Sequence, residues 1–259
     1  MPDLVLEQQA IPLLEYDPSP GVIVPHVPGL ETPLPERWVL CFFAEQIQTL
    51  VDQGLAMQVA ATGSEAGPIP IYQLRHHDQD LLLMHPGVGA PFSAALLEEA
   101  IACGAHKIIV CGGCGVLNRE IAVGHLLVPE DAVRDEGTSY HYLPASRRVA
   151  ATPEAVQAIV ATLEAEQVPY LRTTTWTTDA FYRETAAKVR LRRDEGCLCV
   201  EMEAAALFAV ARYRQILLGV LLYAGDDVSG TIWDGRGWHT RTEARREVLR
   251  LALDACCRM

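Results

Sequence analysis

Two carboxylates, Glu201 and Glu203, stand where the character of the chain changes. Residues 197–200 are a short apolar run typical of a buried strand, and residues 204–211 carry apolar side chains at helical spacing. Side chains two positions apart share a face of an extended segment, so both carboxylates would leave the strand end together. A carboxylate among apolar neighbours needs hydrogen-bond donors, and the vicinal hydroxyls of a sugar offer two. The alternative is an exposed first helical turn in which both acids favour the helix dipole.

A second acidic strand end follows after one helix. Residues 219–224 are typical of a strand, and Gly225, Asp226 and Asp227 form its C-terminal end. In open α/β sheets, ligands bind outside the carboxyl ends of the strands. Two such ends that carry acids, with one helix between them, predict the wall of a pocket.

Together these segments resemble the nucleoside phosphorylase superfamily, which includes purine nucleoside phosphorylase, uridine phosphorylase and methylthioadenosine nucleosidase. The specific match is VEMEAAALF at residues 200–208, followed by the strand end that bears Asp226. The resemblance covers residues 38–257 and is strongest at 85–93, 111–117, 177–184 and 200–208. It implies a single-domain, three-layer α/β/α fold with a central mixed, partly barrel-like sheet.

The resemblance also implies roles at the sugar. Glu203 would hold the ribose 2′ and 3′ hydroxyls, and Met202 would pack on the sugar ring. Glu201 would brace the site or contact the base. A held sugar also keeps the anomeric carbon near the attacking atom.

At the base, the resemblance implies that Asp226 assists N7 of a purine as it departs. Such an acid needs a raised pKa, which partial burial beside Asp227 and Tyr223 would provide. The neighbouring Asp227 leaves a one-residue ambiguity. Pyrimidine-specific relatives lack this acid, so we expect a purine nucleoside. Phe181 would place its ring over the base, with ordinary core packing as the alternative.

Two glycine clusters follow predicted strands, and in their order they match two glycine loops of the family. Glycine lets a ligand approach the backbone closely and leaves N–H groups available to it. Gly87, Gly89, Gly113, Cys114 and Gly115 are therefore candidates for loops that hold an anion or the nucleophile.

The nucleophile itself is open between phosphate and water. Phosphorolytic relatives carry Gly-Asp-x-x-Arg after the first strand and a further arginine before the second glycine cluster. The corresponding places here are residues 43–46, which read FAEQ, and Val110. Glu45 and Gln46 fall near the position where the nucleosidase branch carries the acid that activates water, or else they belong to a surface helix.

Three other arginines could restore a phosphate site, namely Arg37, Arg75 and Arg183. We expect phosphate as a possible co-substrate and no other cofactor.

The chain has 8 cysteines, of which Cys111 and Cys114 form a CxxC pair. A zinc site needs about four ligands, and the second half of such a pattern is missing. Reduced, packed thiols are the default in a cytoplasmic chain, so we expect no bound metal. A redox or metal protein that uses these two residues is the least favoured hypothesis.

Composition narrows the choice of partners. The formal net charge of -12 argues against nucleic acid, which needs a basic patch. No apolar run reaches the length of a membrane span, and the N-terminus lacks the features of a signal peptide, so we expect a cytoplasmic protein. The expected partner is a small-molecule nucleoside.

The elements that must position these residues begin after a Pro-rich arm at residues 1–36, which holds half of the 16 prolines. The arm would lie over the domain or a neighbouring subunit, where His26 could reach that subunit's site, or else it would be a loose tail. Residues 37–259 form the catalytic domain, with strand, glycine-turn and helix units that favour a parallel or mixed sheet. Thr152 is the expected cap of a helix over 153–167. The family implies a homo-oligomer: a dimer, trimer or hexamer.

The favoured function is cleavage of the N-glycosidic bond of a nucleoside, to give free base and either pentose or pentose 1-phosphate. The alternative is a non-catalytic protein on the same fold that binds nucleosides or bases, which the missing arginines favour.

Overall fold

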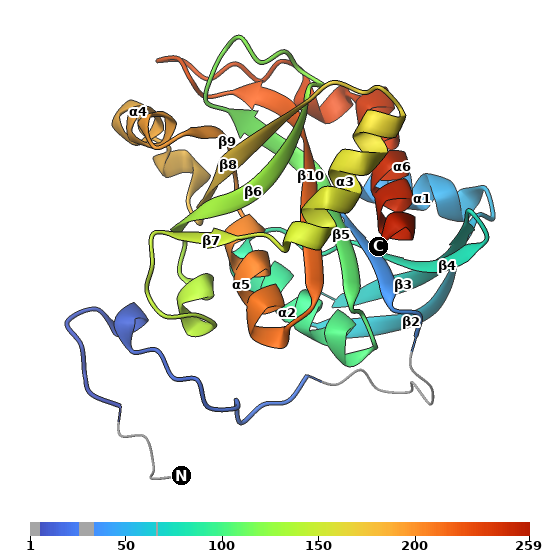
Figure 1. Cartoon of the computed structure of the whole chain (residues 1–259), viewed down its shortest axis with the longest axis horizontal. Helices are drawn as coiled ribbons and strands as arrows, with labels where there is room; N and C mark the ends of the chain where they lie inside the picture. The colour runs from blue at the N-terminus through green and yellow to red at the C-terminus, as the bar shows by residue number, and fades with distance from the viewer. Residues whose placement is uncertain (1–5, 26–33, 66) are drawn as a thin grey trace.

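A mixed sheet runs through the molecule, and helices cover both of its faces (Figure 1). The computed structural model describes residues 6–25, 34–65 and 67–259, so the predicted role of His26 falls outside the described residues. The strands are β1 (Arg37–Cys41), β2 (Ala56–Ser64), β3 (Gly67–His76), β4 (Gln79–Met84), β5 (Lys107–Val116), β6 (Leu126–Asp135), β7 (Arg148–Ala150), β8 (Tyr170–Thr178), β9 (Cys197–Glu201) and β10 (Leu217–Asp227).

Part of the sheet closes into a barrel. The order β10-β6-β8-β9-β5 returns on itself because β10 also pairs with β5. The β10–β5, β6–β8 and β8–β9 pairs are parallel, whereas β10–β6 and β5–β9 are antiparallel. From β5 the sheet continues as β1-β4-β3-β2. The predicted mixed, partly barrel-like sheet is thus confirmed.

The helices complete the three layers. They are α1 (Ala44–Asp52), α2 (Ala90–Ala102), α3 (Pro153–Ala165), α4 (Ala186–Asp194), α5 (Ala204–Arg214) and α6 (Thr242–Arg258). Helices α3 and α6 pack side by side, while α2 packs against α5 (Figure 1). Residues 204–211 of α5 are all buried, which explains why all of their side chains are apolar.

Helix α3 begins as predicted, with Thr152 at its N-cap and Pro153 in its first turn. The Thr152 side chain, however, makes no capping hydrogen bond. Its hydroxyl donates to the Ile216 carbonyl at 3.3 Å and accepts from the Leu218 N–H at 3.1 Å. Thr152 therefore fixes α3 to the start of β10.

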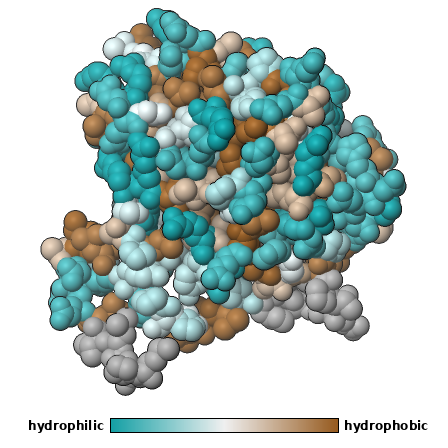
Figure 2. Space-filling model, viewed as in Figure 1, coloured by the Kyte–Doolittle hydropathy of each residue, from teal (hydrophilic) through white to brown (hydrophobic). Residues whose placement is uncertain are grey.

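The described part of the arm runs along the lower edge of the molecule (Figure 1). A short 3-10 helix, η1 (Pro12–Leu14), contacts η2 (Thr138–His141). The apolar side chains at positions 22–24 are exposed, and the arm contributes to the apolar surface at the lower left of Figure 2. Within the described residues, no helix is long and apolar enough to cross a membrane.

Candidate functional site

A cavity of about 780 Å³ brings together residues from distant parts of the chain. Its size is within the range of small-molecule sites. Strands β5, β9 and β10, helices α5 and α6, and the loop after β10 all contribute to its lining. The polar and aromatic side chains of the lining include Phe43, Phe181, Glu184, Glu201, Glu203, Tyr223, Asp226, Trp233, Trp238 and Arg245.

Glu201 ends strand β9 and is bound to its surroundings through both carboxylate oxygens. Oε1 accepts from the hydroxyls of Thr177 at 2.6 Å and Thr175 at 3.3 Å. Oε2 accepts from the N–H groups of Glu203 at 2.7 Å and Ala204 at 2.6 Å. Burial raises the pKa of the Glu201 carboxyl, and these donors oppose that rise. Among its predicted roles, this geometry favours bracing the start of α5.

Glu203 follows a bend in the chain and lies at the N-cap of α5. Its Oε1 accepts from the Gly89 N–H at 2.7 Å, and its Oε2 from the Met202 N–H at 3.1 Å. Burial and, to a smaller degree, the charge of Glu201 raise the pKa of Glu203 to about 8. Glu203 and Met202 both line the cavity. The exposed helical turn considered for the two acids is therefore wrong, because Glu203 is 8% exposed.

Asp226 enters the cavity through an irregularity in β10. The register of β10 against β5 shifts between Ala224 and Asp227, as in a β-bulge. Bulges re-aim side chains next to functional sites. The Asp226 carboxylate accepts from the Trp233 indole N–H at 2.7 Å, and both residues line the cavity.

The neighbouring Asp227 has a different environment. Its carboxylate accepts from Arg236 Nη2 and from the Ser229 N–H, both at 2.8 Å. Burial acts to raise the pKa of Asp227, but the hydrogen bonds from Ser229 and the positive charge of Arg236 outweigh it and lower the pKa. Asp226 lines the cavity and Asp227 does not, so of the two acids the geometry favours Asp226 for contact with a ligand.

Phe181 begins the 3-10 helix η3 (Phe181–Arg183) and lines the cavity. Its side chain is 51% exposed, and its ring lies 4.1 Å from that of Tyr182 between centroids. Core packing is therefore excluded for Phe181. Two residues later, Glu184 also lines the cavity. Burial and the charge of Asp226 raise the pKa of Glu184 to about 7.

Two residues of the lining, Glu184 and Arg245, were not predicted from the sequence. Helix α6 carries Arg245 into the cavity wall, where its side chain is 12% exposed. Its guanidinium donates to the Tyr223 hydroxyl at 3.2 Å and to Glu45 Oε1 at 2.8 Å. The same group lies over the ring of Phe43, 5.3 Å from its centroid.

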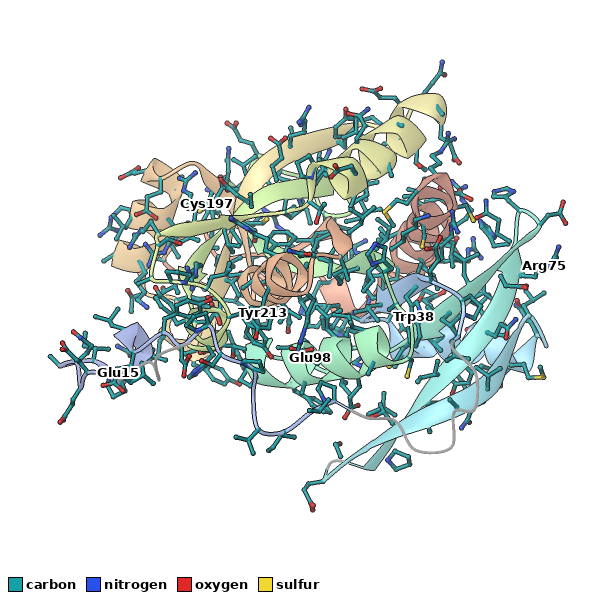
Figure 3. The ribbon with its side chains drawn as sticks, turned by 60° about the horizontal axis from the view of Figure 1, so that its bottom comes forward. Glu15, Trp38, Arg75, Glu98, Cys197 and Tyr213 are labelled. Carbon is teal, nitrogen blue, oxygen red and sulfur yellow. The ribbon has the colours of Figure 1, made fainter. Side chains whose placement is uncertain are left out.

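The arginines proposed from the sequence lie elsewhere. Arg75 pairs with Asp80 and points outward from the end of the β3–β4 hairpin, whereas Trp38 lies inside the molecule (Figure 3). Arg37 pairs with Glu36. Neither these two arginines nor Arg183 belong to the cavity lining. Of the two candidates for water activation, Glu45 pairs with Arg245, whereas Gln46 is buried and donates to the Thr242 carbonyl.

The second glycine cluster is not a loop, and that prediction is wrong. Gly113, Cys114 and Gly115 lie inside β5, although all three line the cavity. A Cβ on Gly113 would stand 3.0 Å from the ring of Tyr223, and one on Gly115 would stand 3.4 Å from the Asp226 carboxylate. These glycines make room for side chains, as glycine in a strand often does.

The first glycine cluster does form a turn, with φ of 73° at Gly87 and 92° at Gly89. Its N–H groups are already engaged. The Gly87 N–H donates to His85 Nδ1 at 3.0 Å, and the Gly89 N–H donates to Glu203. An anion at this turn would therefore compete with Glu203.

The CxxC pair is divided between two buried environments. Cys111 lies against Cys41, and Cys114 against Cys199. Burial raises the pKa of both thiols, which keeps them protonated and poorly nucleophilic. Within the described part of the chain, neither belongs to a cluster that could hold a metal.

The chain is similar in sequence to two nucleoside phosphorylases. At 31% identity over 142 residues, the chain matches a guanosine phosphorylase of Halorubrum lacusprofundi, across 55% of this chain and 59% of that protein. It also matches a uridine phosphorylase of Thermococcus kodakarensis at 35% identity, across 37% of this chain and 35% of that protein. The matches thus span less than two thirds of these relatives.

Among solved structures, uridine phosphorylase from Vibrio fischeri superposes with a TM-score of 0.73 at 24% identity, covering 87% of this chain and 93% of that one. Purine nucleoside phosphorylase from Toxoplasma gondii in complex with immucillin-H superposes with a TM-score of 0.75 at 21% identity, covering 92% and 97%. At this identity the structures establish the fold. The profile of the family described as "Phosphorylase superfamily" matches residues 36–259. The chain therefore belongs to the phosphorylase superfamily.

Proposed function

We propose that this chain is an enzyme that cleaves the N-glycosidic bond of a purine nucleoside. The observation that carries the proposal is that Glu203, Asp226 and Phe181, from three separate elements, line one cavity that is large enough for a nucleoside. The guanosine phosphorylase among the relatives supports a purine substrate, whereas the uridine phosphorylases among them make specificity a question for experiment.

Glu203 is proposed to hold the sugar. Its carboxylate would accept hydrogen bonds from the ribose 2′ and 3′ hydroxyls and would exchange part of its backbone hydrogen bonding for them. The buried, raised-pKa state of Glu203 supports this role, because an incoming diol supplies donors that favour the ionised carboxylate.

Asp226 and Glu184 are proposed to serve the base. As the C1′–N9 bond breaks, its electrons pass to the purine, which then takes a proton at N7. Burial and the charge of Asp226 raise the pKa of Glu184 to about 7, so Glu184 can carry a proton near neutral pH. Glu184 would be the source of the proton and Asp226 would pass it to N7, after which the Glu184 carboxylate would face an N–H edge of the base.

We propose phosphate as the nucleophile, with Arg245 as its anchor. Arg245 is the arginine in the cavity lining, and a guanidinium binds phosphate oxygens well. Tyr223 and Glu45 each accept from one of its nitrogens, so phosphate must share Arg245 with these two internal partners. An oxygen of phosphate would then form the new bond to C1′ and yield pentose 1-phosphate. Water, activated by Glu45, is the competing nucleophile.

The test is release of free base from guanosine, inosine, adenosine and uridine, measured by chromatography with and without phosphate. We expect purine release that requires phosphate and is lost in Glu203→Ala and Asp226→Asn. Glu154→Gln, at an exposed position in α3, is the matched control. Cleavage without phosphate would establish water as the nucleophile. Thermal stabilisation by nucleosides without any cleavage would instead favour a binding protein.

The expected homo-oligomer remains a proposal. Light scattering coupled to size-exclusion chromatography would measure the mass of the assembly, and a monomer at micromolar concentration would contradict the expectation.

A further inference from the structure

Two neighbouring histidines and one aspartate meet at the end of the β3–β4 hairpin. The Nε2 atoms of His76 and His77 lie 2.6 Å and 2.8 Å from the same oxygen, Oδ1 of Asp254. The two imidazole centroids are 4.4 Å apart. The ligand atoms of the three residues all lie within 4.8 Å of one another.

The backbone explains how adjacent residues reach the same oxygen. Successive side chains of a strand point to opposite faces. Here His76 pairs with Gln79, and the two residues between them, His77 and Asp78, have φ of 44° and 61°. Positive φ at both central positions is typical of a type I′ hairpin turn, which usually contains Asn-Gly. In this turn the ring of His77 lies beside that of His76.

The third member comes from helix α6 and is held firmly. Asp254 is 7% exposed, and its other oxygen, Oδ2, accepts from Arg250 Nη1 at 2.6 Å. Arg250 is itself paired with Glu166 and Glu247, so its positive charge is largely offset. A carboxylate fixed on one oxygen by such a partner presents the other oxygen to a metal, as outer-shell groups do in metal sites.

We propose that His76, His77 and Asp254 bind a divalent transition metal, with Zn²⁺ as the best match. Two imidazoles and one carboxylate, with water as the fourth ligand, are a donor set that zinc accepts. Each neutral ring needs only to carry its proton on Nδ1 in place of Nε2. With bonds of about 2.0–2.1 Å the ligand atoms would stand roughly 3.3 Å apart, so the present contacts of 2.6 Å and 2.8 Å must open by about 0.5–0.7 Å.

The site is separate from the cavity, because none of its three residues belongs to the lining. It goes beyond the proposed function and does not depend on it. It also revises the expectation of no bound metal, which considered cysteine spacing alone. A metal here would join the β3–β4 hairpin to the C-terminal helix, which otherwise meet through the contacts of Asp254 and of Cys257.

The test uses the full chain, freed of any affinity tag and treated with a chelator, and titrated with ZnSO₄ by calorimetry and by thermal unfolding. We expect one Zn²⁺ per chain and a rise in the melting temperature, which Mg²⁺ does not reproduce. His77→Asn keeps a residue that tolerates positive φ and should weaken zinc binding by tenfold or more. His106→Asn, another exposed histidine, should leave it unchanged.

Failure of the wild-type chain to bind micromolar Zn²⁺ would overturn the proposal. Binding that His77→Asn leaves intact, or that both variants weaken equally, would do the same, since it would mark adventitious association. Nucleoside cleavage is not a readout here, so loss of the proposed function would leave this result standing.

Discussion

The acid Glu203 is buried next to a second acid, and this arrangement affects stability as well as binding. Its pKa of about 8 in the folded chain exceeds the ordinary 4.5. Between these values the folded state holds the proton that the unfolded state has lost, so stability falls as pH rises through this window. The loss amounts to at most about 1.4 kcal/mol per pH unit.

Glu203→Gln removes this titration. We expect its melting temperature to decline less than that of the wild type between about pH 5 and pH 8, as thermal circular dichroism would measure. Glu154→Gln, at an exposed site, should follow the wild-type curve. A variant whose melting temperature declines in parallel with the wild type would show that Glu203 ionises normally.

Glu184 gives a prediction on substrate choice. A carboxylate accepts from the N1–H and exocyclic amine of guanine, whereas adenine has no hydrogen on N1. Glu184→Gln should therefore lower kcat/KM for guanosine by roughly ten- to a hundredfold, the size of one charge-assisted hydrogen bond. Adenosine should be affected less. An unchanged ratio of guanosine to adenosine cleavage would contradict the assignment.

Of the individual residues in the cavity, the acids at the two strand ends could be predicted from the sequence, whereas Glu184 and Arg245 could not. Glu203 and Asp226 were found because each follows an apolar run that predicts a strand. Glu184 lies in a polar segment with no periodicity. Arg245 belongs to a helix rich in charged residues, where alternating charges usually indicate a solvated face. Only the packing of α6 against the sheet reveals that this side chain reaches the cavity.

The turn between β4 and α2 contacts Glu203 through one hydrogen bond, which the Gly89 N–H donates to its carboxylate. Gly89 has φ of 92°, and a Cβ there would meet no atom within 4 Å. Gly89→Ala should therefore act through backbone strain, which costs about 1–3 kcal/mol. We expect lower thermal stability and a raised KM for the nucleoside, because the Gly89 N–H loses its alignment with Glu203.

The matched control is Gly63→Ala in β2, where there is also open space but no positive φ. It should change stability by only a few tenths of a kcal/mol, because alanine fits a strand backbone. Equal effects of the two substitutions on stability and KM would mean that backbone conformation at Gly89 is unimportant.

The end of strand β5 could not be predicted from the local sequence pattern. The cluster at residues 112–115 was expected to be a turn, since glycine is common in turns. It continues β5 because β10 pairs with it, and the ring of Tyr223 needs the space that Gly113 leaves. That requirement is set by a strand more than a hundred residues away, so local sequence does not reveal it.

In the whole molecule, the N-terminal arm precedes the segment that matches the family. The family profile begins at residue 36, and the side chains at positions 22–24 of the arm are largely exposed. We expect a chain that lacks residues 1–33 to fold, with a melting temperature within a few degrees of the full-length value. Calorimetry would measure this, and aggregation or loss of cooperative unfolding would contradict it.

The hydrogen bond between Trp233 and Asp226 offers a way to observe ligand binding in the cavity. The indole donates to Oδ2 of the carboxyl that a purine is proposed to contact, so a purine that binds this oxygen would displace the ring. The fluorescence of an indole responds to such a change in surroundings. Trp233 would then report ligand binding, and the rate of its fluorescence change in stopped-flow mixing would separate displacement of the ring from cleavage of the glycosidic bond.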